Sequence, residues 1–215
     1  IKDQCAKYHL NILGGDTVRT EGPMVWTVTI IGDVPKGTAI MRSGAQVGDI
    51  VGITNYVGYA ATGLGALSYN LDGYHMTKVG HQRPDPQIEL GQQLRQLGIH
   101  SMNDISDGLG SELNEIASAS NVSIVIEEKA IPLHEETYEL AKYLQTNPVD
   151  YALYGGEDFQ LVFTAPKSLL PKLENLAGIT IIGEVVSGSA QVQMVTPDKT
   201  IKTIEAKGYN HFHES

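Results

Sequence analysis

Two carboxylates and a hydroxyl crowd one short segment of the chain, where they could bind metal and phosphate together. Asp104, Ser106 and Asp107 stand in the run at 103–108 (Asn-Asp-Ile-Ser-Asp-Gly), just before a segment with helical periodicity. A helix N-terminus offers free N–H groups and the positive end of the helix dipole, which favour phosphate. Mg²⁺ prefers oxygen ligands and brings phosphate with it. Plain helix capping by Asp or Ser explains the same residues, so the spacing leaves both interpretations open.

Two glycine pairs also precede acidic residues. Residues 14–17 (Gly-Gly-Asp-Thr) follow an apolar run at 10–13, and residues 155–158 (Gly-Gly-Glu-Asp) precede an alternating segment at 159–163. Paired glycines let a backbone approach a ligand closely, and Asp16 would lie at the end of a strand. The alternative is a tight turn in which glycine supplies positive φ and the acids are solvated.

Arg42 could pair with phosphate through its planar guanidinium, although a surface salt bridge is the alternative. Three glycines between Gly58 and Gly65 lack the Lys-Ser/Thr of a phosphate-binding loop, so they predict close helix packing instead. The seven histidines show no metal-ligand spacing, and Cys5 is predicted to fill space on a helix.

Composition limits the class of protein. The chain has 215 residues, 41% of them hydrophobic, which suffices for a sizeable core. A formal net charge of -10 disfavours nucleic acid as a partner, whereas a small polyphosphate can be bridged to carboxylates by a divalent metal. A single cysteine excludes an intramolecular disulfide and suits a cytoplasmic location. No stretch approaches the roughly 20 apolar residues that span a membrane, and because the chain opens on Ile1 we expect it to begin inside a larger protein.

Periodicity predicts interleaved helices and strands. Apolar residues at helical spacing predict helices over 90–97 and 109–116, and the composition of residues 68–85 predicts a loop. Further helices are predicted at 60–67, 137–144 and 169–176, and strands at 10–13, 25–31, 50–54, 122–126, 159–163 and 179–185. The predicted fold class is α+β or mixed α/β, with helices packed on a largely antiparallel or mixed sheet. Glycines and Pro35 predict a domain boundary between 1–35 and 36–215.

The order of the motifs is more specific than any one of them. The matching segments are Gly-Gly-Asp-Thr at 14–17, Arg-Ser-Gly at 42–44, Arg-Pro-Asp-Pro at 83–86, Asp-Ile-Ser-Asp-Gly at 104–108, Gly-Gly-Glu-Asp-Phe at 155–159 and Gly-Tyr-Asn-His-Phe at 208–212. In this order they resemble the thiamine-monophosphate kinase family over essentially the whole chain. That family belongs to the fold group of aminoimidazole ribonucleotide synthetase and selenophosphate synthetase.

The resemblance implies a reaction and a role for each residue. The family transfers the γ-phosphoryl group of ATP to thiamine monophosphate, which gives thiamine diphosphate. By this resemblance Asp16 binds Mg²⁺, and further Mg²⁺ ions are held by Asp104 and Asp107; the three aspartates also form the catalytic set. ATP contacts are implied for Gly15, Asp16, Arg42 and Ser106, and thiamine contacts for Glu157 and Tyr209.

The chain also departs from the family pattern. The aspartate-rich first half of the family is not found here, so residues 1–35 would be the remnant of an N-terminal ATP- and metal-binding domain and residues 36–215 the synthetase-like C-terminal domain. We expect a homodimer at full length and an inactive fragment otherwise. Tyr59, Gln87 and Asn210 differ from the commoner family residues. The alternatives are another ATP-using enzyme of the fold group, a non-catalytic nucleotide-binding fragment, and a domain whose acids only cap helices and turns.

Overall fold

The first 34 residues form a unit of their own with little regular structure. The structure is a computed structural model that describes residues 1–207, and it divides into the units Ile1–Val34 and Pro35–Ser215. Unit 1 contains the helix α1 (Lys2–Lys7) and no strand. The strands predicted at 10–13 and 25–31 are therefore wrong. Alternating apolar residues predict an extended chain, but a strand also needs a neighbour for its N–H and C=O groups, and no segment of unit 1 supplies one.

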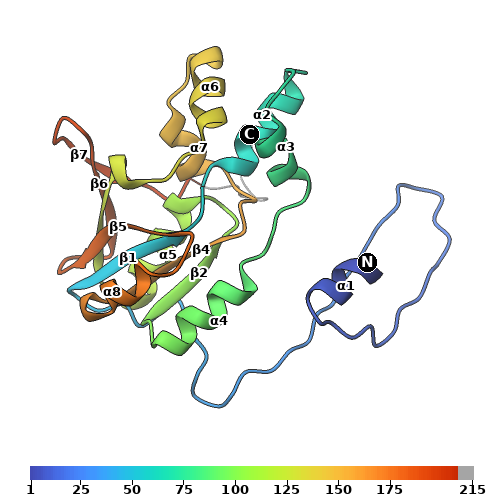
Figure 1. Cartoon of the computed structure of the whole chain (residues 1–215), viewed down its shortest axis with the longest axis horizontal. Coiled ribbons are helices and arrows are strands. Elements are labelled where there is room, and N and C mark those ends of the chain that lie inside the picture. Colours follow the sequence, from blue (N-terminus) through green and yellow to red (C-terminus); the bar gives the residue numbers. More distant parts are fainter. Residues whose placement is uncertain (208–215) are drawn as a thin grey trace. The chain divides into compact units, whose positions relative to one another are not determined.

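Unit 2 is built on one seven-stranded mixed sheet (Figure 1). The strands are β1 (Asp49–Thr54), β2 (Ser101–Ile105), β3 (Ser123–Glu127), β4 (Gln160–Pro166), β5 (Ile179–Val186), β6 (Gln191–Val195) and β7 (Ile201–Ile204). Their order in the sheet is β2-β4-β1-β5-β3-β6-β7. The β3–β6 pair is parallel, and the other pairs described are antiparallel.

Helices cover both faces of this sheet. They are α2 (Tyr59–Ser68), α3 (His75–Gln82), α4 (Ile88–Leu97), α5 (Leu109–Ser120), α6 (Glu135–Leu144), α7 (Pro148–Tyr154) and α8 (Leu170–Leu173), with short 3₁₀ turns η1 (Glu128–Ala130) and η2 (Lys167–Leu169). The apolar faces of α5 and α7 pack with Val51 and Ile53 of β1 in the larger core. On the opposite face, Leu94 of α4 and Leu173 of α8 pack against Phe163 of β4. Alternation along the strands explains the two cores, because successive side chains point to opposite faces.

The helices α2, α3 and α6 gather beyond one end of the sheet (Figure 1). The interpretation of the glycines at 58–65 as a close-packing device is confirmed, since Gly63 of α2 lies against the backbone of α3 and Gly65 against Leu140 of α6. The loop predicted at 68–85 is wrong in its second half, where α3 forms. The carboxylate of Glu136 accepts hydrogen bonds from the backbone N–H groups of Met76 (3.3 Å) and Thr77 (2.8 Å). This cap comes from a distant part of the sequence, so local periodicity could not reveal the helix.

The predicted fold class is confirmed: helices pack on a mixed, mostly antiparallel sheet. Each helix and each strand predicted in unit 2 overlaps an observed element, and most bounds agree within about two residues. The exceptions are α8, which is shorter than predicted, and α5 and β4, which end at Ser120 and Pro166, beyond their predicted ends. Over residues 1–207, the helices are all too short or too polar to cross a membrane.

Candidate functional site

Two motifs that are about fifty residues apart in sequence lie side by side. The strand β2 pairs with β4, and the loop before β4 continues this contact past the end of β2. The backbone N–H of Glu157 donates to the carbonyl of Ser106 (2.8 Å), and that of Phe159 donates to the carbonyl of Ile105 (2.9 Å). Both Glu157 (φ 68°) and Phe159 (φ 49°) adopt the left-handed conformation, which is uncommon for non-glycine residues and clusters at functional loops. The acidic turn and the Gly-Gly-Glu-Asp loop therefore form one surface.

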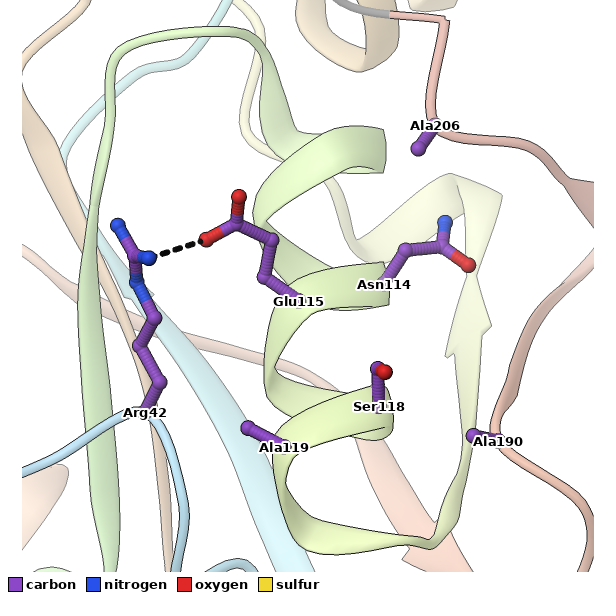
Figure 2. A pocket seen from close by; sticks show the side chains of 7 residues that line it. All are labelled: Arg42, Asn114, Glu115, Ser118, Ala119, Ala190 and Ala206. Carbon is purple, nitrogen blue, oxygen red and sulfur yellow. Dashed lines mark ion pairs between the residues drawn. The ribbon is translucent and has the colours of Figure 1, made fainter.

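Arg42 reaches this surface from the segment before β1. Its Nε donates to Oδ1 of Asn103 (3.0 Å), and its Nη1 pairs with Oε2 of Glu115 (2.9 Å). Figure 2 shows the ion pair among the side chains that line an open depression. The volume of this depression is about 480 Å³. The depression is lined by Arg42, Asn114, Glu115, Ser118, Ala119, Ala190 and Ala206. The Arg42 side chain is about half exposed, so an incoming phosphate would compete with Glu115 for its guanidinium.

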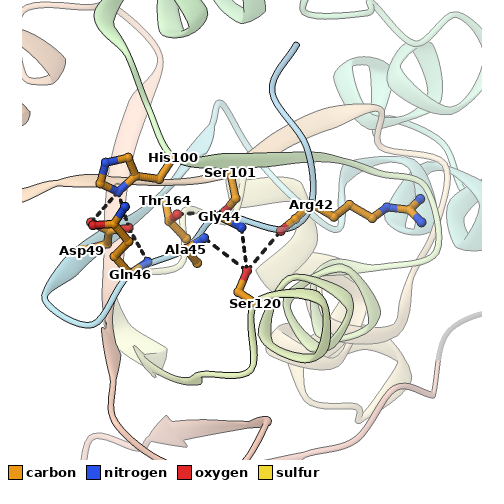
Figure 3. A network of polar contacts seen from close by, with 9 residues as sticks. All are labelled: Arg42, Gly44, Ala45, Gln46, Asp49, His100, Ser101, Ser120 and Thr164. Atoms are coloured by element: carbon orange, nitrogen blue, oxygen red, sulfur yellow. Dashed lines mark hydrogen bonds and ion pairs between the residues drawn. The ribbon is translucent and has the colours of Figure 1, made fainter. Parts of the chain in front are cut away.

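The backbone around Arg42 is fixed by the end of α5 (Figure 3). The hydroxyl of Ser120 accepts hydrogen bonds from the N–H groups of Gly44 and Ala45, both 3.1 Å, and donates to the carbonyl of Arg42 (3.3 Å). Gly44 has φ 130°, and a Cβ there would lie 2.5 Å from the carbonyl oxygen of His100. Only glycine fits this turn, which sets the direction in which the arginine leaves it.

A carboxylate that the motifs did not single out lies beneath the acidic turn. Glu112, in the first turn of α5, is only 3% exposed. Burial raises the pKa of Glu112 to about 7; the N–H of Asp107 acts in the opposite direction, and the charges of Glu115, Asp104 and Asp107 raise it further. Four carboxylates thus surround this turn, and Arg42 is paired with one of them.

This excess of negative charge suits a divalent cation. Asp104 and Asp107 are both exposed and flank the turn, whereas strand alternation turns the Asn103 side chain to the other face of β2, toward α5. Among residues 1–207 no three His, Cys, Asp or Glu side chains are grouped closely enough to hold a metal ion by themselves. Mg²⁺ is usually held by one or two carboxylates together with phosphate oxygens and water, and the exposed Asp104 and Asp107 suit such a cation.

Comparison with known proteins identifies the domain. Residues 47–195 match the family model "AIR synthase related protein, C-terminal domain". The chain belongs to this family.

Relatives within this family carry a more specific name. Thiamine-monophosphate kinase of Bacillus subtilis (strain 168) is 38% identical over 216 residues, covering 95% of this chain and 65% of the relative. The crystal structure of thiamine-monophosphate kinase from Stenotrophomonas maltophilia K279a is 30% identical with a TM-score of 0.69, covering 75% of this chain and 54% of that one. A structure of AaThiL complexed with AMPPCP and TMP is 34% identical with a TM-score of 0.69, covering 80% and 54%. The resemblance read from the ordered motifs is confirmed, and the chain spans less than two thirds of the length of these relatives.

The AIR synthase related domain buries one acid of the Gly-Gly-Glu-Asp motif and exposes the other. Glu157 is exposed, but Asp158 is 5% exposed, and its carboxylate accepts from the N–H groups of Gly58 (2.6 Å) and Ala60 (2.8 Å) at the start of α2. The alternative in which both acids are solvated is therefore wrong for Asp158. Burial raises the pKa of Asp158 to about 7, although the N–H groups of Ala60, Gly58 and Tyr59 act in the opposite direction. This carboxylate ties the candidate loop to α2.

We expect the stability that Asp158 contributes to depend on pH. Its folded-state pKa lies above that of an unfolded aspartate, so its contribution is fully present below about pH 4 and is lost as the pH rises through 7. An asparagine side chain does not titrate, so the stability advantage of the wild type over the variant Asp158→Asn should shrink across this window. Thermal melts of both forms of the complete protein at a series of pH values measure the difference. A difference that stays constant with pH would contradict the expectation.

The remaining predicted residues lie in unit 1 or outside the described residues. Gly15 and Asp16 lie in unit 1, where both are exposed and the carboxylate of Asp16 accepts from the N–H of Thr17 (2.7 Å). Tyr209 falls outside the described residues. Of the departures from the family pattern, Gln87 accepts a hydrogen bond from the amide of Asn55 (3.1 Å), and Tyr59 contacts the rings of Tyr56 and His134.

Proposed function

We propose that the complete protein transfers the γ-phosphoryl group of ATP to thiamine monophosphate with Mg²⁺, giving thiamine diphosphate and ADP. The observation that carries this proposal is the contact between two loops. The Ser106–Asp107 turn offers oxygen ligands and a hydroxyl for the nucleotide side, and the Glu157 loop bonded to it offers a carboxylate for the acceptor side. The relatives named thiamine-monophosphate kinase, and the AaThiL complex with AMPPCP and TMP, support the same pair of substrates.

The chemistry requires little from the side chains except position and charge. The acceptor phosphate is already ionised, so no general base is needed, and catalysis reduces to alignment and charge neutralisation. Asp16 would bind Mg²⁺, and Asp104 and Asp107 would hold further Mg²⁺ ions; when bound, the metal would neutralise phosphate charge and orient the phosphate oxygens. Arg42 would exchange its bond to Glu115 for one to ATP, with Gly15 and Ser106 contacting the nucleotide. Glu157 would attract the cationic thiazolium, and Tyr209 would provide an aromatic face.

The proposal extends to the parts of the protein that this chain represents only partly. We propose that residues 1–35 are the remnant of an N-terminal ATP- and metal-binding domain and that residues 36–215 form the synthetase-like domain. The motif order and the matched length of the relatives support this division. A cytoplasmic homodimer is the assembly that fits the proposal.

The test is a product assay on the complete protein, with the 215-residue chain assayed in parallel. We expect thiamine diphosphate and ADP in equal amounts from ATP, MgCl₂ and thiamine monophosphate, and none without the metal or with thiamine as acceptor. We expect no product from the shorter chain, although its circular dichroism should show a folded α+β protein, because aspartates on the other side of the nucleotide are needed. ADP without thiamine diphosphate would overturn the proposal and favour another ATP-using enzyme of this fold group.

A further inference from the structure

Glu112 occupies a position where a charge is unusual. It lies on the apolar side of α5, one turn from Leu109 and Ile116 and next to Leu113, all of which are fully buried. Glutamate is seldom this buried unless it has partners, because removing an ionised carboxylate from water costs free energy. The partners of Glu112 therefore indicate what the side chain does.

Both carboxylate oxygens of Glu112 face the candidate site. Oε1 accepts from the backbone N–H of Asp107 (3.2 Å) and from the hydroxyl of Ser106 (3.5 Å). Oε2 accepts from the side-chain amide of Asn103 on β2. One side chain thus holds the turn that carries Ser106 and Asp107 and, at the same time, the strand that leads into it.

Asn103 continues the connection to Arg42. The Asn103 side chain is 8% exposed, and its Nδ2 donates to Glu112 while its Oδ1 accepts from Nε of Arg42 (3.0 Å). The carboxylate fixes which end of the amide faces it, because only the NH₂ end can donate. The oxygen end must then face the guanidinium. Glu115 accepts from the same NH₂ group (3.3 Å) and pairs with Arg42 directly, so Glu112 and Glu115 together set the orientation of Arg42.

We propose that Glu112 is a positioning residue of the candidate site, which fixes the Ser106–Asp107 turn directly and the Arg42 guanidinium through Asn103. The expected effect on kcat rests on the proposed function. The expected effect on AMPPCP binding does not depend on which reaction the protein catalyses. An ordinary capping box also has a glutamate reaching back to a backbone N–H before a helix. A cap alone does not explain the second oxygen, which faces Asn103 and, through it, the arginine.

The test compares two buried or half-buried carboxylates that both accept backbone N–H groups. Glu112→Gln keeps the size of the side chain but brings an NH₂ group toward either Asn103 or the Asp107 N–H. Glu136→Gln makes the same change in α6, where the carboxylate of Glu136 caps the start of α3 by accepting from the N–H groups of Met76 and Thr77. In the complete protein we measure the melting temperature, calorimetric binding of AMPPCP with MgCl₂, and kcat with KM for ATP.

We expect both variants to melt at a lower temperature, but only Glu112→Gln to weaken AMPPCP binding and kcat, each by about tenfold, as is typical when an outer partner of a binding group is lost. Glu136→Gln should leave both within about twofold of the wild type. Folded Glu112→Gln with unchanged AMPPCP binding would overturn the assignment. Normal AMPPCP binding by the wild type without thiamine diphosphate formation would overturn the proposed reaction and leave the positioning role standing.

A second variant keeps the inference testable if Glu112→Gln does not fold. Asn103→Ala removes the link to Arg42 and leaves the bonds from Glu112 to the turn. We expect Asn103→Ala to lower AMPPCP affinity by about fivefold or more. Arg42→Ala should then lower the affinity by a smaller factor in the Asn103→Ala background than in the wild type, because the effects of coupled residues are not additive. Fully additive losses would show that Asn103 does not act through Arg42 and would overturn that part of the proposal.

Discussion

Replacing Asp107 by asparagine in the complete protein is expected to lower turnover by about a hundredfold or more, the range seen when a preorganised electrostatic group is removed from a transition state. The substitution keeps the backbone N–H of residue 107 that donates to Glu112, so the turn should keep its shape. What the variant loses is the negative charge of an exposed carboxylate at the candidate cation site. We therefore expect the melting temperature to change by only a few degrees or less.

The control is Asp150→Asn, which changes an exposed aspartate in the first turn of the helix α7. It should alter neither turnover nor metal dependence. Plain capping is not the role of this side chain, because α5 begins at an N-cap glycine, Gly108, with no side-chain cap hydrogen bond. Turnover is measured against MgCl₂ concentration, together with a thermal melt. The result that would contradict a metal-binding role is normal turnover of Asp107→Asn with an unchanged dependence on MgCl₂.

The second large effect is structural, and it concerns the contact between α2 and α3. A Cβ on Gly63 would lie 2.1 Å from the carbonyl oxygen of Thr77 and 2.6 Å from its carbonyl carbon. Both are backbone atoms of α3, so the helices would have to separate. We expect Gly63→Ala to destabilise the protein by about 3 kcal/mol, at the upper end of the cost of overpacking.

Gly91→Ala in α4 is the matched control, because its Cβ would lie 3.3 Å from Cδ1 of Leu161, the end of a side chain that can move. Alanine favours a helix over glycine by about 1 kcal/mol, so this variant should be as stable as the wild type or more so. Urea unfolding of both variants measures the contrast. Equal stability of the two variants would mean that α2 and α3 are not held at this distance.

The elements that could be predicted from the sequence are those in which the spacing of the apolar residues alone indicates a helix or a strand. Leu90, Leu94 and Leu97 mark α4, and the alternation around Phe163 marks β4. The segment of α3 is polar and contains Gly80, and its start is capped by Glu136 of α6, so its helical state depends on a distant part of the chain. The same limit explains the error at 25–31, where the pattern indicates an extended backbone but cannot supply a partner strand.

For the candidate site, the motifs predicted the two loops that carry Ser106 and Glu157, but they did not predict the contacts that connect these loops to each other and to α5. The spacing of Ser106 and Glu157 in sequence does not show that their backbones are hydrogen-bonded. A signal for Glu112 was present, because it lies one turn from Leu109 and Ile116 on a face that is otherwise apolar. A charged residue in an apolar stripe is uncommon and indicates a specific role. Asp158 gave no comparable signal, since its burial comes from α2, about a hundred residues earlier.

The strand order has a consequence for the synthesis of the chain. The first three strands, β1, β2 and β3, do not pair with one another; every pairing in the described sheet includes β4, β5, β6 or β7. The ribosome must therefore synthesise β4, which begins at Gln160, before the first pair of strands can form. Until then β1, β2 and β3 have no partner strand for their backbone N–H and C=O groups. Long-range pairing of this kind folds slowly and exposes intermediates to aggregation. We expect a nascent chain stopped before β4 to stay protease-sensitive and to depend on chaperones, whereas one that extends past β5 should close around β1.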